Sequence, residues 1–178
     1  MLDENESVIL VNTSDDEIGT APKLAAHHAG QLHRAFSVFI RDPEGKLLIH
    51  RRADDKYHSG GLWTNSCCGH PRPGEDTALA ARRRLREEMG IECDLVRAGT
   101  FLYRAGLDNG LIEHELDHVF NGVYSDDPHP DSAEVCEWMW ISPEDLTDWV
   151  ARDRNAFTAW FTDALDAATL EESLENPG

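Results

Sequence analysis

Lysine is the scarcest charged residue type in this chain of 178 residues. Only Lys23, Lys46 and Lys56 occur, and lysine and arginine together number 16 against 34 aspartates and glutamates, for a formal net charge of −18. A surface this acidic repels nucleic-acid phosphates and anionic lipid headgroups. We therefore expect no nucleic-acid or membrane partner. The acidic, lysine-poor composition is also typical of proteins kept in solution in a high-salt cytoplasm.

Long apolar runs are missing as well. No run approaches the roughly 20 residues that span a bilayer, and the acidic N-terminus lacks the basic-then-apolar pattern of a secretory signal. We therefore expect a cytoplasmic protein. The cysteines fit neither a disulfide framework nor a CxxC metal motif, which predicts free thiols. They are Cys67, Cys68, Cys93 and Cys136.

The length and the 40% of hydrophobic residues suit one globular domain over residues 1–178, with mobile tails at about 1–6 and 171–178. A helix over 76–89 is expected to end at Gly90. After Ser142-Pro143 we expect one short helix and then a longer one near 155–170. Strands are expected at 7–11, 35–40, 46–52, 94–103, 114–124 and 136–141. This mixture indicates an α+β fold or an αβα sandwich.

One segment has a dense pattern of glycine, arginine and acidic residues. It reads Gly69-His-Pro-Arg-Pro-Gly-Glu75, then seven residues, then Arg83-Arg-Leu-Arg-Glu-Glu-Met-Gly-Ile91. It resembles the Nudix box, G-x5-E-x7-R-E-U-x-E-E-x-G-U with U bulky and apolar, at eight positions. Such a loop–helix–loop gathers carboxylates that hold Mg²⁺ against a diphosphate. The resemblance implies a Nudix-type αβα sandwich with a mixed sheet.

One position departs from this box. Arg84 stands in place of the first helical glutamate, one turn before Glu88 on the same helix face. A guanidinium removes a metal ligand and adds a donor for diphosphate, which argues against hydrolysis assisted by several Mg²⁺ ions. An ion pair with Glu88 is the structural alternative. The eight basic residues between 51 and 86 leave a similar choice, between a solvated helix face and a local anion site.

The segment before the box narrows the resemblance. Trp63-Thr-Asn-Ser-Cys-Cys-Gly-His70 is similar to the W-T-N-S-x-C-G-H-P segment of type 1 isopentenyl-diphosphate isomerases. The similarity extends over about residues 7 to 162. Further matching segments are Lys23-Leu-Ala-Ala-His27 with Leu32-His33, Arg51-Arg52 with Lys56, Tyr103-Arg-Ala, Glu113-His-Glu115 and Ala156-Phe-x-x-Trp160.

This resemblance implies a reaction of isoprenoid biosynthesis, the conversion of isopentenyl diphosphate to dimethylallyl diphosphate. Protonating an unactivated alkene needs a positioned acid on one face and a base on the other, and water must be excluded from the cationic state. The family pattern implies that Cys68 and Glu115 are the proton-transfer groups, with Cys67 as the alternative cysteine. Tyr103 resembles the family's hydrogen-bonding partner on the acid side, and a core tyrosine is its alternative.

The resemblance also implies a metal site. Strand spacing puts Glu113 and Glu115 on one face and His114 and His118 on the other. Spacing alone leaves open which of the two faces supplies the metal ligands. The family pattern selects the glutamates. The implied ligands are His27, His33, His70, Glu113 and Glu115, a mixed N/O set suited to Mn²⁺, Zn²⁺ or Mg²⁺. Because the interval between His27 and His33 appears one residue shorter than in the family, His28 is an alternative first ligand.

A second ion and the substrate contacts follow from the same resemblance. Mg²⁺ is implied to enter with the substrate diphosphate and to be bridged by Glu88. Lys23, Arg52, Lys56 and Arg84 resemble the residues that clamp the diphosphate. Trp160 matches the aromatic residue that stabilises cationic character beside the prenyl group. We expect a monomer or weak oligomer acting on a small molecule.

Two other functions compete with the isomerase. A Nudix hydrolase of a nucleoside diphosphate derivative is the first, and it would need the glutamate that Arg84 replaces. A metal-dependent diphosphate-binding module without catalysis is the second, and it would have no use for the pairing of Cys68 with Glu115. Turnover of isopentenyl diphosphate distinguishes the isomerase from both.

Overall fold

The fold is a mixed sheet of nine strands with β3 (His33–Arg41) at its centre, as the computed structural model of residues 6–169 shows. β3 runs parallel to β8 (Ile112–Val123) from the pair His33–Glu115 to the pair Arg41–Val123. The remaining strands are β1 (Ser7–Val11), β2 (Glu17–Pro22), β4 (Leu47–Arg52), β5 (Trp63–Thr64), β6 (Cys67–Gly69), β7 (Leu95–Gly106) and β9 (Val135–Ile141). The parallel register sets His33 directly beside Glu115.

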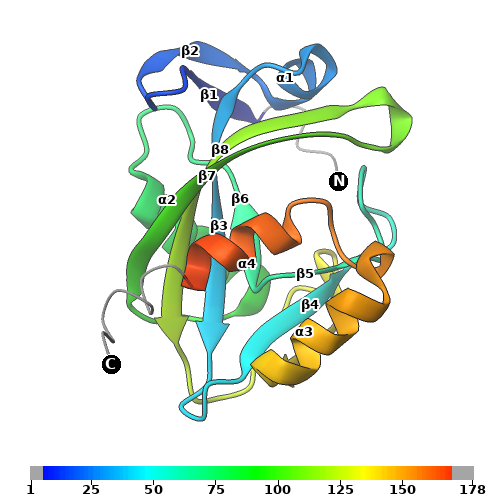
Figure 1. Ribbon diagram of the computed structural model, residues 1–178. Coiled ribbons are helices and arrows are strands. Elements are labelled where there is room, and N and C mark those ends of the chain that lie inside the picture. The colour runs from blue at the N-terminus through cyan, green and yellow to red at the C-terminus, as the bar shows by residue number, and fades with distance from the viewer. Residues whose placement is uncertain (1–5, 170–178) are drawn as a thin grey trace, which may run out of the picture.

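Helices cover both faces of this sheet (Figure 1). Alternation along β3 sends Phe36, Val38 and Ile40 into a core with α2, whereas Phe39 enters a core with α4 on the opposite face. The helices are α1 (Lys23–Ala29), α2 (Thr77–Met89), α3 (Pro143–Arg152) and α4 (Phe161–Thr169), with short 3-10 turns η1 (Asp108–Gly110) and η2 (Arg154–Ala156). The layers match the αβα sandwich expected from the sequence.

The Nudix-like helix α2 begins and ends where the sequence predicts. The Asp76 side chain caps its first turn by accepting from the backbone N–H of Leu79. Gly90 ends it in the left-handed conformation at φ 66°, and a Cβ there would lie 2.7 Å from the carbonyl oxygen of His129. Only glycine suits both constraints.

The helix predicted near 155–170 is present, but it begins six residues later than expected. The chain forms η2, and the helix α4 begins only at Phe161. The reason lies in the backbone between them, because Phe157 forms a β-bridge with Trp63 and the N–H of Thr158 donates to the carbonyl of Trp63. Strands β2, β5 and β6 and helix α1 were not predicted, since each is short and has weak periodicity.

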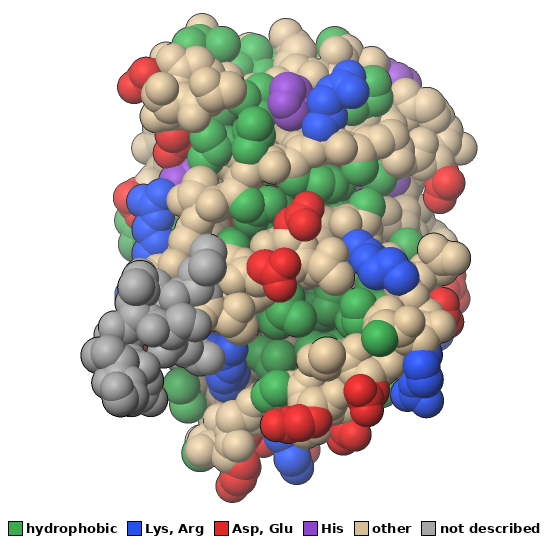
Figure 2. Space-filling view, viewed as in Figure 1, with side chains coloured by type: hydrophobic (Ala, Val, Ile, Leu, Met, Phe, Trp, Pro, Cys, Tyr) green, Lys and Arg blue, Asp and Glu red, His purple; other side chains and the backbone are tan. Residues whose placement is uncertain are grey.

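The predicted mobile tails fall largely outside the described residues. Of them, Glu6 is described, and its carboxylate pairs with Lys23 at 2.7 Å. Among residues 6–169, none of the helices has the length and apolar character that crossing a bilayer requires. Acidic side chains are spread over the face seen in Figure 2, with apolar surface between them.

Candidate active site

A pocket of about 470 Å³ opens where β3, β6 and β8 meet the loop after β4. Its size suits a small-molecule ligand. Of the residues singled out from the sequence, those lining it are Lys23, Arg52, Lys56, Cys68, His70, Arg84, Glu88, Glu113, Glu115 and Trp160. His27, His33 and Tyr103 are buried behind this lining. Segments far apart in the sequence therefore converge on one site.

The two adjacent cysteines lie on opposite sides of β6. Cys67 is fully buried in the core with α2, whereas Cys68 lines the pocket. The Cys68 thiol donates to Oδ1 of Asn65 at 3.1 Å and lies 3.7 Å from the Ser37 hydroxyl. Burial, helped by the nearby Asp117 carboxyl, raises the pKa of Cys68 to about 12. The thiol therefore keeps its proton near neutral pH.

Three histidines and Glu115 form a compact buried group beside this thiol. One donor atom from each of His27, His33, His70 and Glu115 lies within 4.8 Å of the others. Nε2 of His70 is 2.9 Å and Nε2 of His33 is 3.4 Å from Oε1 of Glu115. Burial alone would raise the pKa of Glu115, but the neighbouring imidazoles of His33 and His70 outweigh it and hold that pKa well below its usual range.

Backbone contacts fix the orientation of two of these imidazoles. Nδ1 of His27 is 2.7 Å from the carbonyl oxygen of Lys23, and Nδ1 of His33 is 2.8 Å from that of Gln31. Because a carbonyl only accepts, each Nδ1 carries the proton and each Nε2 keeps a lone pair. Both Nε2 atoms are buried without a hydrogen-bond partner. The group could therefore hold a divalent metal ion.

Glu113 lies at the edge of this group. Its Oε1 is 3.3 Å from Nε2 of His58, and the Tyr103 hydroxyl donates to its Oε2. Glu113, His58 and His27 make a second set of donor atoms within 4.8 Å of one another. Burial and the Glu113 carboxylate raise the pKa of Tyr103. The described contacts of Tyr103 thus link it to Glu113, and none links it to the Cys68 thiol.

The histidines that the sequence left as alternatives lie elsewhere. His28 is exposed, while its neighbour His27 is fully buried in the donor group. On β8, Nδ1 of His114 contacts the carbonyl oxygen of Gly30, and Nε2 of His118 lies 2.9 Å from Asp15. The glutamate face of β8 is therefore the one that meets the pocket.

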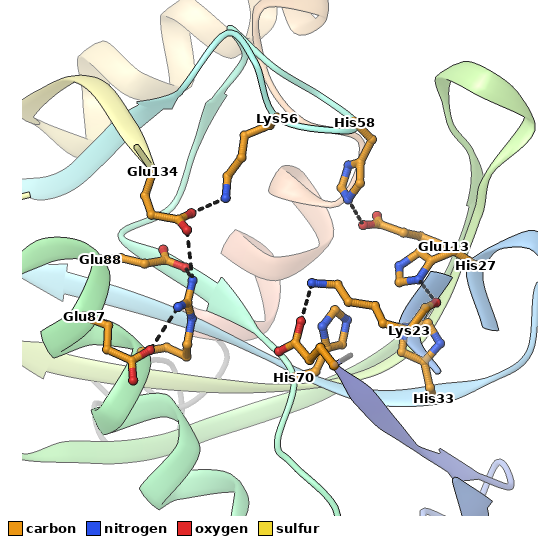
Figure 3. Close-up of polar contacts among 12 residues, drawn as sticks. Lys23, His27, His33, Lys56, His58, His70, Glu87, Glu88, Glu113 and Glu134 are labelled. Carbon is orange, nitrogen blue, oxygen red and sulfur yellow. Dashed lines mark hydrogen bonds and ion pairs between the residues drawn. The ribbon is translucent and has the colours of Figure 1, made fainter. Parts of the chain in front are cut away.

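Three cationic side chains of the pocket are paired with carboxylates (Figure 3). Lys23 pairs with Glu6, and Lys56 pairs with Glu134. Arg84 contacts Glu88, Glu87 at 2.9 Å and Glu134 at 3.7 Å. Arg84 therefore forms the ion pair with Glu88 that was the structural alternative, and it also lines the pocket. Others of the basic stretch form surface pairs, as Arg86 does with Glu92 at 3.6 Å.

Arg52 and Trp160 also line the pocket and contact each other. The Arg52 guanidinium lies 5.6 Å from the centre of the Trp160 ring, a cation–π contact. Trp160 is 4% exposed, and its indole N–H donates to Oδ1 of Asn65 at 3.3 Å. An apolar ring therefore stands close to the thiol that shares the same Asn65 acceptor.

Sequence reasoning missed several residues of the site. Asn65 stood within the matched Trp63–His70 segment, so its presence there was a usable signal. No sequence signal pointed to His58 or Glu134, because His58 lies in an irregular loop and Glu134 lies just before β9. Ser37 and Asp117 belong to no matched segment; Ser37 pairs with Cys68 across β3 and β6, and its hydroxyl donates to Asp117.

The chain is similar to known proteins of one family. The NUDIX domain model matches residues 31–161. A protein of Burkholderia multivorans named isopentenyl-diphosphate Delta-isomerase is 50% identical over 93% of this chain and 94% of its own length. Isopentenyl-diphosphate Delta-isomerase 2 of Aromatoleum aromaticum is 47% identical over 97% of this chain and 92% of its own.

Solved structures share the fold at lower identity. A Deinococcus radiodurans protein is 22% identical and aligns with a TM-score of 0.72 over 91% of this chain and 97% of its own. The MutT protein of Methanosarcina mazei, also 22% identical, aligns with a TM-score of 0.64 over 79% of this chain and 95% of its own. The family model and the similar sequences carry the assignment further: the chain belongs to the Nudix family and, within it, to the isopentenyl-diphosphate Delta-isomerases.

Proposed function

We propose that this pocket isomerises isopentenyl diphosphate to dimethylallyl diphosphate, with Cys68 and Glu115 as the two proton-transfer groups. The observation that carries the proposal is their placement, because a protonated thiol and an ionised carboxylate line one enclosed pocket. One group protonates the terminal alkene carbon and the other removes a proton from C2. The allylic shift moves the double bond without changing the oxidation state of the molecule.

The walls of the pocket suit a cationic intermediate state. Cys68, Glu115 and Trp160 are all largely withdrawn from solvent, which limits capture of the cation by water. The Trp160 π face can stabilise positive charge on the prenyl carbons. Tyr103 acts through Glu113, since its hydroxyl fixes that carboxylate next to the strand position of Glu115.

We assign the diphosphate to the cationic side of the pocket, where Lys23, Arg52, Lys56 and Arg84 clamp it. Glu88 is the residue that would hold a Mg²⁺ ion brought by the diphosphate. His27, His33, His70, Glu113 and Glu115 would hold Mn²⁺, Zn²⁺ or Mg²⁺. A divalent ion bound there lowers the proton affinity of Glu115 and fixes its orientation. The net charge of −18 favours a small-molecule substrate over nucleic acid or anionic lipid.

Replacing Arg84 with alanine is expected to raise KM for isopentenyl diphosphate by about tenfold to a hundredfold, the worth of a charge-assisted hydrogen bond. kcat should change little, because the diphosphate is bound alike in the ground and transition states. Steady-state kinetics measure both. Arg86→Ala is the matched control, because it removes an arginine from the same helix whose side chain is 63% exposed. A collapse of kcat at unchanged KM would show that Arg84 acts on the reaction itself.

Hydrolysis of a nucleoside diphosphate derivative is the competing function, and Arg84 is the observation against it. A guanidinium at this place repels a further cation and cannot ligate one. We expect no release of phosphate or monophosphate from a panel of nucleoside diphosphate derivatives, assayed under the conditions in which isopentenyl diphosphate is converted. Efficient nucleotide cleavage by the purified protein would overturn the proposal.

A further inference from the structure

His58 stands next to the His/Glu group although no sequence pattern pointed to it. It lies in the loop between β4 and β5, is 6% exposed and lines the pocket. Its ring stacks on that of His27 with centroids 6.2 Å apart. A buried imidazole beside another that has an unpartnered Nε2 is a candidate metal ligand.

The spacing of His58 and Glu113 is that of neighbouring ligands on one ion. Two ligands at about 2.1 Å from a metal and at right angles lie about 3 Å apart. Nε2 of His58 and Oε1 of Glu113 are 3.3 Å apart, close to the 3.4 Å between Nε2 of His33 and Oε1 of Glu115. The donors of Glu113, His58 and His27 all lie within 4.8 Å of one another. Figure 3 shows the His58 and Glu113 side chains pointing toward each other beside His27.

His27 joins the two donor sets. It belongs both to the set with His33, His70 and Glu115 and to the set with His58 and Glu113. Its Nδ1 is bonded to the Lys23 carbonyl, so it has one lone pair to give and can bind one ion at a time. The two sets share only His27, so an ion that binds both His27 and Glu113 would have Nε2 of His58 as the donor next to Glu113.

The loop holds His58 firmly in this position. Ser59 adopts the left-handed conformation at φ 52°, and its hydroxyl lies 3.1 Å from Nδ1 of His58. The next residue is Gly60, where a Cβ would lie 2.5 Å from the carbonyl oxygen of Asp54, so the loop closes too tightly for a side chain. A strained backbone of this kind is retained where it positions a functional group.

We propose that His58 is a further ligand of the divalent ion held by His27, His33, His70, Glu113 and Glu115, and that this fourth imidazole increases the preference of the site for Zn²⁺ over Mg²⁺. The inference rests on the proposed His/Glu metal site. Imidazole nitrogen favours borderline ions such as Zn²⁺, whereas Mg²⁺ prefers oxygen ligands. Each added nitrogen therefore shifts the preference toward Zn²⁺.

The test is the binding of the metal alone, without substrate. Zn²⁺ affinity is measured by competition with a chelating dye for the wild type, His58→Ala and His58→Gln, and Mg²⁺ competition gives the selectivity. Both variants should bind Zn²⁺ at least about tenfold more weakly, with a smaller loss for Mg²⁺. His114→Ala is the matched control, since it removes an imidazole from between Glu113 and Glu115 that contacts Gly30 instead.

X-ray absorption of the zinc-loaded proteins counts the ligands directly. Four imidazoles are expected for the wild type and three for His58→Gln, whose melting temperature confirms that it is folded. Wild-type zinc affinity in His58→Gln, or three imidazoles in the wild type, would overturn the inference and leave His58 as a residue that only holds Glu113. A wild type that binds zinc through four imidazoles but does not isomerise isopentenyl diphosphate would overturn the proposed function alone.

Discussion

Cys68→Ala is expected to lower kcat for isomerisation by about a hundredfold to ten-thousandfold, the range over which a positioned acid or base contributes. The thiol lines the pocket, and its raised pKa keeps it protonated. Alanine leaves the fold intact and removes the only proton-transfer atom at this position. Substrate binding should change little, because we assign the diphosphate to the cationic side chains of the pocket and not to Cys68.

Cys67→Ala is the control for this prediction. Cys67 is a neighbouring thiol of the same size, but it is fully buried in the core with α2. Its replacement leaves a small cavity and should reduce the melting temperature slightly while most activity remains. Measuring kcat, KM and the melting temperature for both variants separates chemistry from stability. Comparable activity in the two variants would remove Cys68 from the mechanism.

Exhaustive chelation is expected to inactivate the enzyme, and Mn²⁺, Zn²⁺ or Mg²⁺ should restore activity. The reason is the donor group of His27, His33, His70 and Glu115, in which two Nε2 atoms are buried without a hydrogen-bond partner. Leaving such atoms unpaired costs about 1–3 kcal/mol each, which a bound ion removes. Metal content measured before and after chelation, alongside activity, checks the result.

The two adjacent histidines of α1 provide a matched pair for the same prediction. His27→Ala should lose the metal and the activity, because His27 is fully buried within the donor group. His28→Ala should keep both, because His28 is exposed. Metal loss in the His28 variant only would show that His28, and not His27, is the first ligand. Full activity in verified metal-free protein would rule out a required ion.

The sequence predicted those parts of the fold that depend on local patterning. The helix predicted over 76–89 from its apolar spacing and its glycine stop is found at Thr77–Met89, and it ends at Gly90 as expected. The start of the helix near 155–170 was misplaced because a long-range bridge between Phe157 and Trp63 replaces helical bonding before Phe161. No local signal in the sequence reports such a contact.

The residues of the candidate site also fall into two groups, those that a local sequence pattern predicts and those that only the fold brings to the pocket. Cys68, His70 and Glu115 fall within specific matched segments, and the structure places all three in one pocket. His58 and Glu134 have no motif of their own. They reach the pocket because the tight loop after β4 and the turn before β9 bring them there, and a single sequence does not encode that juxtaposition in readable form. The ion pairs of Lys23 with Glu6 and of Lys56 with Glu134 could likewise not be predicted from the sequence, because they join residues far apart in the chain or without a motif.

The central claim is that this pocket moves the double bond of isopentenyl diphosphate, and product analysis tests it most directly. Purified protein is incubated with isopentenyl diphosphate and a divalent metal, and the two isomeric diphosphates are separated and quantified. We expect dimethylallyl diphosphate to accumulate until the two isomers reach equilibrium, with no phosphate released. Unchanged isopentenyl diphosphate in metal-loaded, folded protein would contradict the account.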